Sequence, residues 1–458
     1  MSDIAATTEA PAGVAVHDPS TPHVPLVSPG YRSYALVVLL VLYTIAFLDR
    51  QIVVILAEPI KDDLNLTDTQ VGVLTGLAFG FVYAGLGLVL ARLADRFNRV
   101  WIIGWSLVSW SIFTLLCGRA TNFTTLLIAR MGVGVGEAGF VPTSHALIAD
   151  YVPREQRASA LAFFAMGTPL GSLLGLAMGG IIADAYGWRT AFLVAGVPGL
   201  VLALVVFLTL REPRKAMSEA AKAAVKTTHT SFVGTLKYLA SKRSFWFISF
   251  GASIKSFIGY GHTPFTAAFF LRVHEAEVAA YAAKFGLQPV GFVGLVFGLL
   301  IGIFVTASSF LGGFIADRFG GRDLRAYCSV PAISSILMVP LTVVALLADS
   351  ALWALIWMMP LNLLAALWYG PVYATAQTLV PPHMRATSAS ILLFIINMVG
   401  LGFGALAVGA LSDFFNFQMG LGEAEGVRWA LIVSGGLGLL SGLLFWMGRR
   451  YIREDAVS

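Results

Sequence analysis

The sequence has little charge: Asp, Glu, Lys and Arg together make up 12% of its 458 residues. A soluble domain carries about 25%. Hydrophobic residues make up 57% of the chain. So few charged groups leave too little polar surface to cover the protein in water, and most of its surface must therefore face lipid. We predict an integral membrane protein.

Cysteine is also scarce. The two cysteines, Cys117 and Cys328, lie in separate apolar stretches, which excludes a disulfide framework or a cysteine metal cluster. The basic residues are scattered singly between apolar runs, so nucleic acid is not an expected partner. No nucleotide-binding signature of an ATP-driven pump occurs. Residues 1–30 lack the basic start of a signal peptide, and we expect them to form a disordered tail.

The chain contains twelve apolar runs, each long enough to cross a membrane as a helix of about 20 residues. Many are interrupted by Gly or Pro, which membrane helices tolerate. We therefore predict an all-α polytopic membrane protein. The runs are centred on residues 33–57, 70–92, 100–118, 123–149, 158–183, 190–210, 245–271, 289–315, 327–348, 351–378, 388–411 and 428–448.

The basic residues predict the topology. With the N-terminus inside, 21 of the 30 Lys and Arg lie in inside segments and 6 in outside loops, which favours both termini in the cytoplasm. The polar stretch 211–244 separates six runs from six. We predict an N-terminal bundle at 31–210, a cytoplasmic linker at 211–244, a C-terminal bundle at 245–450 and tails at 1–30 and 451–458.

The two halves of the chain resemble each other. The tetrapeptide Ala-Asp-Arg-Phe follows the second run at 94–97 and the eighth at 316–319. Val-Pro joins runs four and five at 152–153, and runs ten and eleven at 380–381. Because these matches keep the same order, we predict two parallel six-helix repeats with a binding site at their interface near mid-membrane.

Three short motifs resemble signatures of the major facilitator superfamily of transporters, and the resemblance covers all twelve runs. The loop signature Gly-x-x-x-Asp-Arg-x-Gly-x-Arg is complete at 313–322, while Ala91 and Asn98 replace the glycines of the first copy. Arg130-x-x-x-Gly134 lies in run four. An approximate antiporter motif at 167–171 carries an extra Thr168.

Within that superfamily, residues 47–51 (Phe-Leu-Asp-Arg-Gln) and 134–138 (Gly-Val-Gly-Glu-Ala) are most similar to the Spinster family. Spinster proteins are linked to the movement of sphingolipids and lysophospholipids, including sphingosine-1-phosphate, and proton coupling has been proposed for them. The resemblance implies a proton-coupled transporter of an amphipathic, anionic, lipid-like solute.

The resemblance also implies a role for the loop signature, which in the superfamily latches the helix ends in one conformational state. Acidic groups near helix N-termini and neighbouring arginines gain charge interactions that helix sliding would break. The alternative is that the arginines only anchor the topology. The latch residues would be Asp95, Arg96, Arg99, Asp317, Arg318 and Arg322.

Five ionisable residues are predicted at membrane depth: Asp49, Arg50, Arg130, Glu137 and Lys255. Each costs about 2.5–3.5 kcal/mol there, so such residues usually face a cavity and pair with one another. Arg130 and Glu137 are seven residues apart, hence on one helix face about 10.5 Å apart. Asp49 and Arg50 are adjacent and point about 100° apart.

These residues predict a proton switch. Burial raises a carboxyl pKa and a nearby guanidinium lowers it, so proton uptake would depend on where the arginines lie. We predict that Asp49 and Glu137 bind the proton, and that Arg50 and Arg130 alternate between these carboxylates and an anionic substrate group. The alternative is fixed ion pairs, which are an expensive way to hold helices together.

Other candidates remain open at this stage. Lys255 would either meet a phosphate headgroup or extend to the membrane interface with its stem in lipid. His262, within the interrupted stretch 260–264, would form a gate or be hydrogen-bonded in the bundle. Aromatic and amide residues of runs ten and eleven would line the cavity or pack the bundle: Trp368, Tyr369, Tyr373 and Asn397.

Two motifs are misleading. Residues 134–139 match the dinucleotide fingerprint Gly-x-Gly-x-x-Gly, but no strand precedes them, and close helix packing explains the glycines better. His145 and Asp150 have the spacing of an acyltransferase motif, but residues five apart on a helix point about 140° apart.

We therefore predict a proton-driven secondary transporter with alternating access and no cofactor other than protons. It would contact an amphipathic solute and membrane lipids, act as a monomer and lie in a bacterial inner membrane. The alternatives are a proton-coupled carrier of sugars, organic anions or drugs and, from another class, a membrane-embedded acyltransferase.

Overall fold

The computed structural model describes residues 27–153, 156–213, 232–320 and 323–457. Most of the predicted N-terminal tail lies outside these residues. Within them, all regular structure is helical. The N-terminal half contains α1 Pro29–Ile55, α2 Ala57–Leu64, α3 Asp68–Gly72, π-helix η1 Val73–Leu77, α4 Ala78–Arg96, α5 Arg99–Cys117, α6 Phe123–Ala138, α7 Phe140–Tyr151, α8 Arg157–Ala165, α9 Gly167–Tyr186 and α10 Trp188–Thr209.

The C-terminal half has the same kind of organisation after a short additional helix. It contains α12 Phe232–Ala240, α13 Arg243–Val273, α14 Glu275–Lys284, α15 Pro289–Leu300, π-helix η4 Ile301–Val305, α16 Thr306–Gly320, α17 Ala326–Leu346, α18 Ala351–Ala365, α19 Tyr369–Thr378, 3-10 helix η5 Pro382–Met384, α20 Arg385–Asn397, π-helix η6 Met398–Gly402, α21 Phe403–Asp413, π-helix η7 Phe414–Gln418 and α22 Gly422–Asp455.

These boundaries refine the predicted division of the chain. The predicted linker contains α12 and the first residues of α13, and α22 continues five residues past the predicted end of the C-terminal bundle. Residues 451–455 are therefore helical and do not belong to a tail. Continued main-chain hydrogen bonding, including the bond from the Ala456 N–H to the Ile452 carbonyl, explains the longer helix.

Several helices begin where a polar side chain accepts from the first free N–H groups. Asn98 accepts from the N–H of Trp101 at the start of α5, and Ser350 accepts from Trp353 at the start of α18. Thr67 and Gln70 form a reciprocal capping box at α3. These local signals set the points at which the chain turns between spans.

Eleven segments of the described residues are long and apolar enough to cross a membrane. They correspond to eleven of the twelve predicted runs. The remaining run is α13, whose 31 residues are long enough but include Lys255, His262 and several serines, which lower its hydropathy. Many residues of this helix are buried, including Lys255 and several of the serines.

Corresponding spans of the two halves are both interrupted, and spans four and ten are interrupted at the same place. Span four breaks at Gly139, thirteen residues before Val152, and span ten breaks around Leu367, thirteen residues before Val380. Spans two and eight contain η1 and η4. Since π-helical turns and breaks free main-chain groups for other partners, the repeat places irregular backbone on both sides of the molecular centre.

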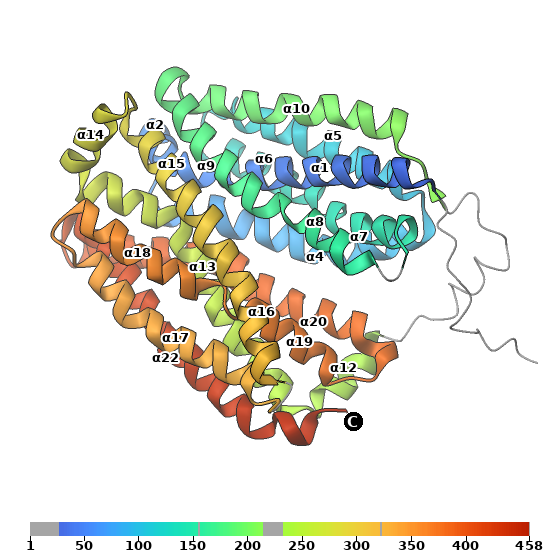
Figure 1. Ribbon diagram of the computed structural model, residues 1–458. Coiled ribbons are helices and arrows are strands. Elements are labelled where there is room, and N and C mark those ends of the chain that lie inside the picture. Colours follow the sequence, from blue (N-terminus) through green and yellow to red (C-terminus); the bar gives the residue numbers. More distant parts are fainter. Residues whose placement is uncertain (1–26, 154–155, 214–231, 321–322, 458) are drawn as a thin grey trace, which may run out of the picture.

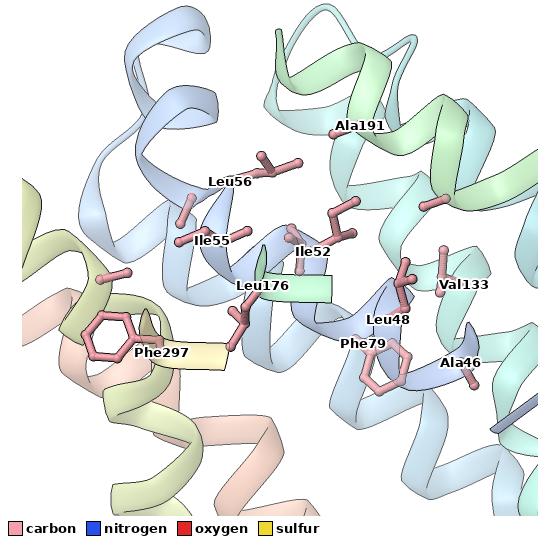
Figure 2. Packing of buried hydrophobic residues seen from close by; sticks show 14 of the residues in the cluster. Ala46, Leu48, Ile52, Ile55, Leu56, Phe79, Val133, Leu176, Ala191 and Phe297 are labelled. Atoms are coloured by element: carbon pink, nitrogen blue, oxygen red, sulfur yellow. The ribbon is translucent and has the colours of Figure 1, made fainter. Parts of the chain in front are cut away.

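The two halves form two helix bundles that lie side by side (Figure 1). Helices α2 and α14 lie at one end of the molecule, and the C-terminus lies at the other. At Gly294 of α15 a β-carbon would be 2.2 Å from the carbonyl oxygen of Leu176 in α9, so only glycine allows this close approach between the halves. Figure 2 shows Leu176 beside Phe297 of α15.

Candidate functional site

Four of the five predicted central charges lie on α1 and α6, inside the N-terminal half. The Nε of Arg50 donates to Oε2 of Glu137 over 2.6 Å, and Glu137 is 1% exposed. Glu137 thus lies in surroundings of low dielectric, where its charge depends on its partner, while the Arg50 side chain keeps 16% of its surface exposed. The structure therefore joins Arg50 to Glu137, two of the predicted site residues.

Aromatic rings surround the Arg50 guanidinium. Its Cζ lies 5.0 Å from the ring centre of Phe47, 4.9 Å from that of Phe79 and 4.4 Å from that of Tyr83. Ring faces attract a cation within about 6 Å. Arg50 therefore keeps favourable contacts even when Glu137 is not its partner.

Asp49 makes its side-chain hydrogen bond elsewhere. Its Oδ2 accepts from the Thr114 hydroxyl of α5 over 3.1 Å, while its buried Oδ1 has no hydrogen-bond partner. Glu137 Oε1 is likewise buried and without a partner. A buried acceptor left unpaired costs about 1–3 kcal/mol. Each carboxyl thus offers one oxygen on which a proton can be placed.

Arg130 does not complete an ion pair among the described residues. It is 2% exposed, its Nε lies 3.5 Å from the Leu74 carbonyl, and its guanidinium lies over the Phe79 ring. Leu74 belongs to η1, whose wider turns leave this carbonyl available. The predicted contact between Arg130 and a carboxylate is absent here, and its role as a switch stays a prediction.

Lys255 of α13 is buried, and its ammonium group donates to the Met338 sulfur. It does not extend to the membrane interface, which removes one of its two predicted roles. His262 lines one side of an open cavity of about 130 Å³. Its Nε2 lies 3.0 Å from the Ser434 hydroxyl.

The predicted aromatic residues divide into two groups. Trp368 is 2% exposed and stacks on Tyr369, so it lies in the core and not on a cavity wall. Tyr369 and Tyr373 stack on each other with ring centres 6.3 Å apart, and both they and Asn397 are only partly covered. Bulky rings pack a bundle as readily as they line a cavity, which explains why Trp368 is a core residue.

The open cavity lies within the C-terminal half and reaches the N-terminal half at Val54 and Leu176. Apart from His262, its polar residues were not predicted, because they are uncharged and lie singly within apolar runs. Polar residues within apolar runs are the signal that would have found them. They are Thr263, Thr266, Thr342 and Asn362, beside His262.

A second charged cluster, not predicted from the sequence, joins the halves at the end that carries α2 and α14; we call it the tether. Arg272 of α13 binds the Glu58 carboxylate at 2.6 and 2.7 Å and the Asp68 carboxylate at 2.7 and 2.8 Å. Asp413 of α21 accepts from the N–H groups of Asp68 and Thr69 at the start of α3. The sequence showed these residues only as loop charges.

The fold and the central site can be compared with known proteins. The family model described as Major Facilitator Superfamily matches residues 39–405. The chain belongs to the Major Facilitator Superfamily.

Several superfamily members resemble the chain over most of its length. An MFS-type efflux pump of Mycolicibacterium smegmatis is 32% identical over 428 residues, which are 93% of this chain and 95% of that protein. Protein spinster homolog 3 of Danio rerio is 28% identical and covers 96% of this chain and 89% of its own length. The protein is thus a superfamily transporter similar to Spinster.

A solved structure supports the same relationship. A bacterial homologue of the human lysosomal transporter Spinster, in an inward-facing and unoccupied conformation, superposes with a TM-score of 0.83 at 28% identity. The match covers 94% of this chain and all of that one. The protein therefore shares the superfamily fold of two six-helix bundles.

Membership of this superfamily removes the acyltransferase alternative, since its members are transporters. His145 lies against the Phe164 ring, and Asp150 pairs with Arg99. The glycines of 134–139 lie in α6 and at its end. A β-carbon at Gly136 would be 2.5 Å from the main-chain nitrogen of Trp110. Both misleading motifs thus serve helix packing.

The superfamily loop signature is only partly described. The side chains of Asp95, Arg96 and Arg322 lie outside the described part of the chain. Asp317 accepts from the Tyr327 hydroxyl over 3.2 Å, and Arg318 is exposed. Arg99 is buried and bonds both the Ala146 carbonyl and Asp150, which ties α5 to α7. The latch role of these residues stays a prediction.

Proposed function

We propose that this protein is a proton-coupled secondary transporter that moves an amphipathic, anionic, lipid-like solute by alternating access. The observation that carries the proposal is the buried Arg50–Glu137 pair, next to a second buried carboxyl with an unpartnered oxygen at Asp49. Such groups at membrane depth are costly and usually functional. A fixed pair alone would explain neither the free oxygen atoms nor the rings around Arg50.

The proposed coupling step is a proton transfer to Glu137. A proton placed on Oε1 neutralises the carboxyl while Oε2 still faces Arg50. The guanidinium then keeps its contacts with Phe79 and Tyr83 and becomes free to bind an anionic group. When the solute leaves, Glu137 gives up its proton and pairs with Arg50 again. Asp49 acts as a second proton site in the same half.

The proposed solute is lipid-like because of the relatives and the cavity. Two relatives bear the Spinster name or description, and the open cavity is lined mainly by apolar side chains such as Ile258, Phe297 and Leu361. An arginine recognises phosphate and carboxylate groups well. The solute class is thus a single-chain lipid with an anionic headgroup, of the lysophospholipid or sphingosine-phosphate type.

The proposed orientation places both termini in the cytoplasm, as the distribution of Lys and Arg favours. The tether then closes the outer side, and the structure corresponds to an inward-facing state, like that of the similar Spinster homologue. We further propose a monomer in a bacterial inner membrane that needs no cofactor besides protons.

A second candidate is the efflux of a different amphipathic compound, such as a drug. The 32% identity to a bacterial efflux pump favours it. The two candidates differ at the headgroup, because only the first requires an anion. A carrier of sugars is less favoured by a cavity wall that is mainly apolar.

Transport in proteoliposomes that contain a pH-sensitive dye tests the proposal. Addition of a lysophosphatidic acid should move protons with the native protein, whereas the matching monoacylglycerol, which lacks the phosphate, should not. Glu137→Gln and Asp49→Asn should lose proton movement and keep part of the solute exchange. Exposed Glu275 supplies the matched control, Glu275→Gln. Intact proton movement in both site variants would reduce these carboxyls to packing elements.

A further inference from the structure

The open cavity beside His262 has a distinctive hydrogen-bonding character. Its threonines all use their hydroxyl hydrogens within their own helices. Thr263 donates to the Gly259 carbonyl over 2.7 Å, Thr266 to the His262 carbonyl over 2.8 Å and Thr342 to the Met338 carbonyl over 2.9 Å. A hydroxyl has one hydrogen and two lone pairs. These oxygens therefore remain acceptors.

The same reasoning fixes the state of His262. The Ser434 hydroxyl donates to the Ala430 carbonyl over 2.6 Å, so its oxygen faces His262 as an acceptor. The hydrogen of the neutral imidazole must then be on Nε2, since the other ring nitrogen of that tautomer is an acceptor. The Nδ1 of His262, a residue that lines the cavity, is thus a further acceptor.

Asn362 supplies the remaining polar group. Its Nδ2 donates to the Met358 carbonyl over 2.8 Å, which identifies the amide nitrogen and leaves Oδ1 free. One amide hydrogen is left as well. The cavity residues therefore offer several acceptors and one donor. A ligand hydroxyl, which donates one hydrogen to an acceptor and can accept the one donor, matches this set.

The charges near the cavity disfavour a cationic group. None of the described residues that line it is a carboxylate. The Lys255 ammonium lies against Met338, which is one of the lining residues. A cationic amine would meet no counter-charge and would be repelled by Lys255, whereas a hydroxyl meets neither penalty. Of the two proposed solute types, the cavity therefore favours the lysophospholipid, since a sphingosine phosphate carries an amine beside its headgroup.

The cavity also adjoins the anion site. Val54 lines the cavity. It follows Arg50 by four residues on α1, so Val54 and Arg50 lie on the same face of the helix, about 6 Å apart along its axis. We propose that this cavity binds the neutral, hydroxyl-bearing apolar portion of the solute whose anionic group meets Arg50. The inference rests on the proposed function and adds to it a second requirement, a free hydroxyl near the headgroup.

Binding of two matched lipids to the purified protein in nanodiscs tests this proposal without any transport step. The first is 1-decanoylglycerol-3-phosphate, which carries a free 2-hydroxyl, and the second is its 2-deoxy analogue. The native protein should prefer the hydroxyl compound by about two- to twelve-fold, the value of one neutral hydrogen bond. Asn362→Leu combined with Thr266→Val should bring this ratio close to one.

Two further variants distinguish a failure of the hydroxyl site from a failure of the proposed solute class. Thr378→Val is the matched control, since Thr378 also donates to the carbonyl four residues earlier but does not line the cavity; its ratio should equal the native one. Arg50→Gln should weaken both lipids and leave their ratio unchanged. An unaltered ratio in the double cavity variant would overturn the hydroxyl site alone. Failure of both lipids to bind the native protein would overturn the proposed solute class together with this inference.

Discussion

Arg50 and Glu137 form their 2.6 Å ion pair within one half of the molecule, between α1 and α6. The pair can therefore open without any movement of one half against the other. By contrast, Arg272 holds Glu58 and Asp68 across the two halves. The pair that we propose for ligand and proton is thus separate from the pair that joins the two halves.

Substitutions at Arg50 should have graded effects on the affinity for an anionic lipid. Arg50→Lys keeps the charge and loses the planar guanidinium that lies over Phe47, Phe79 and Tyr83. Desolvated ring contacts of this kind are worth up to about 2 kcal/mol, so we expect a loss of roughly tenfold. Arg50→Gln should weaken binding further. Titration calorimetry in nanodiscs measures both, and equal affinity of the lysine variant and the native protein would contradict the role of the rings.

Removal of Arg272 should open the tether. Arg272→Gln leaves Glu58 and Asp68 without their shared partner, and breaking a buried pair typically costs about 3–5 kcal/mol. We expect a longer and broader distance between spin labels at Asp62→Cys in α2 and Ala280→Cys in α14. The two native cysteines are buried, which limits background labelling.

The control for the tether is Arg189→Gln. Arg189 pairs with Asp63 over 2.7 Å within the N-terminal half, and both side chains are more than 40% exposed. Exposed pairs contribute little, so the label distance should stay as in the native protein. A shift of the same size in both variants would mean that the distance reports general destabilisation.

A side chain at Gly294 should force α9 and α15 apart. The new β-carbon of Gly294→Ala would lie 2.2 Å from the Leu176 carbonyl oxygen. Overpacking of this kind costs about 1–3 kcal/mol, and we expect a lower melting temperature for the purified protein. Gly436→Ala is the control, because nothing lies within 4 Å of its β-carbon. A melting temperature of Gly294→Ala at or above the control would refute the close contact.

His274, between α13 and α14, should make stability depend on pH. Burial lowers its pKa, and Arg428 lowers it further, while Glu277 acts in the opposite direction. The unfolded chain then binds a proton at higher pH than the folded protein does. The contribution of His274 is complete above about pH 6.5 and falls as the pH drops below that value.

We therefore expect the melting temperature to fall further between pH 7.5 and pH 5.5 for the native protein than for His274→Gln. His383→Gln, at an exposed histidine, should behave like the native protein. If His274→Gln shows the native acid sensitivity, the effect arises from other groups.

The sequence predicted the architecture because hydrophobicity is a local property. Apolar runs of sufficient length and the repeated motifs at 94–97 and 316–319 gave the helices and the two halves. Helix ends were less certain: α22 continues to Asp455, and α12 forms inside the predicted linker. Such ends depend on contacts made later in folding, for example the bonds from Ser244 to the Asp455 carboxylate.

The candidate site was predicted in part. Depth in the membrane identified Asp49, Arg50 and Glu137, but not Thr114 or the rings around Arg50, because an uncharged side chain in an apolar run lacks the high insertion cost that marks a charged one. The tether was missed for a related reason. Its residues, such as Asp68 and Arg272, lie far apart in the sequence and looked like ordinary loop charges.

The sequence by itself determined that this chain spans a membrane as two related bundles and that a few charged groups must lie inside them, since both follow from the cost of placing polar groups in hydrocarbon. Only the tertiary structure decided which groups meet. Arg50 and not Arg130 reaches Glu137, and Arg130 turns to the Leu74 carbonyl. The rotation of α1 and η1 against α6 selects these partners, and that rotation is set by the packing of many side chains at once.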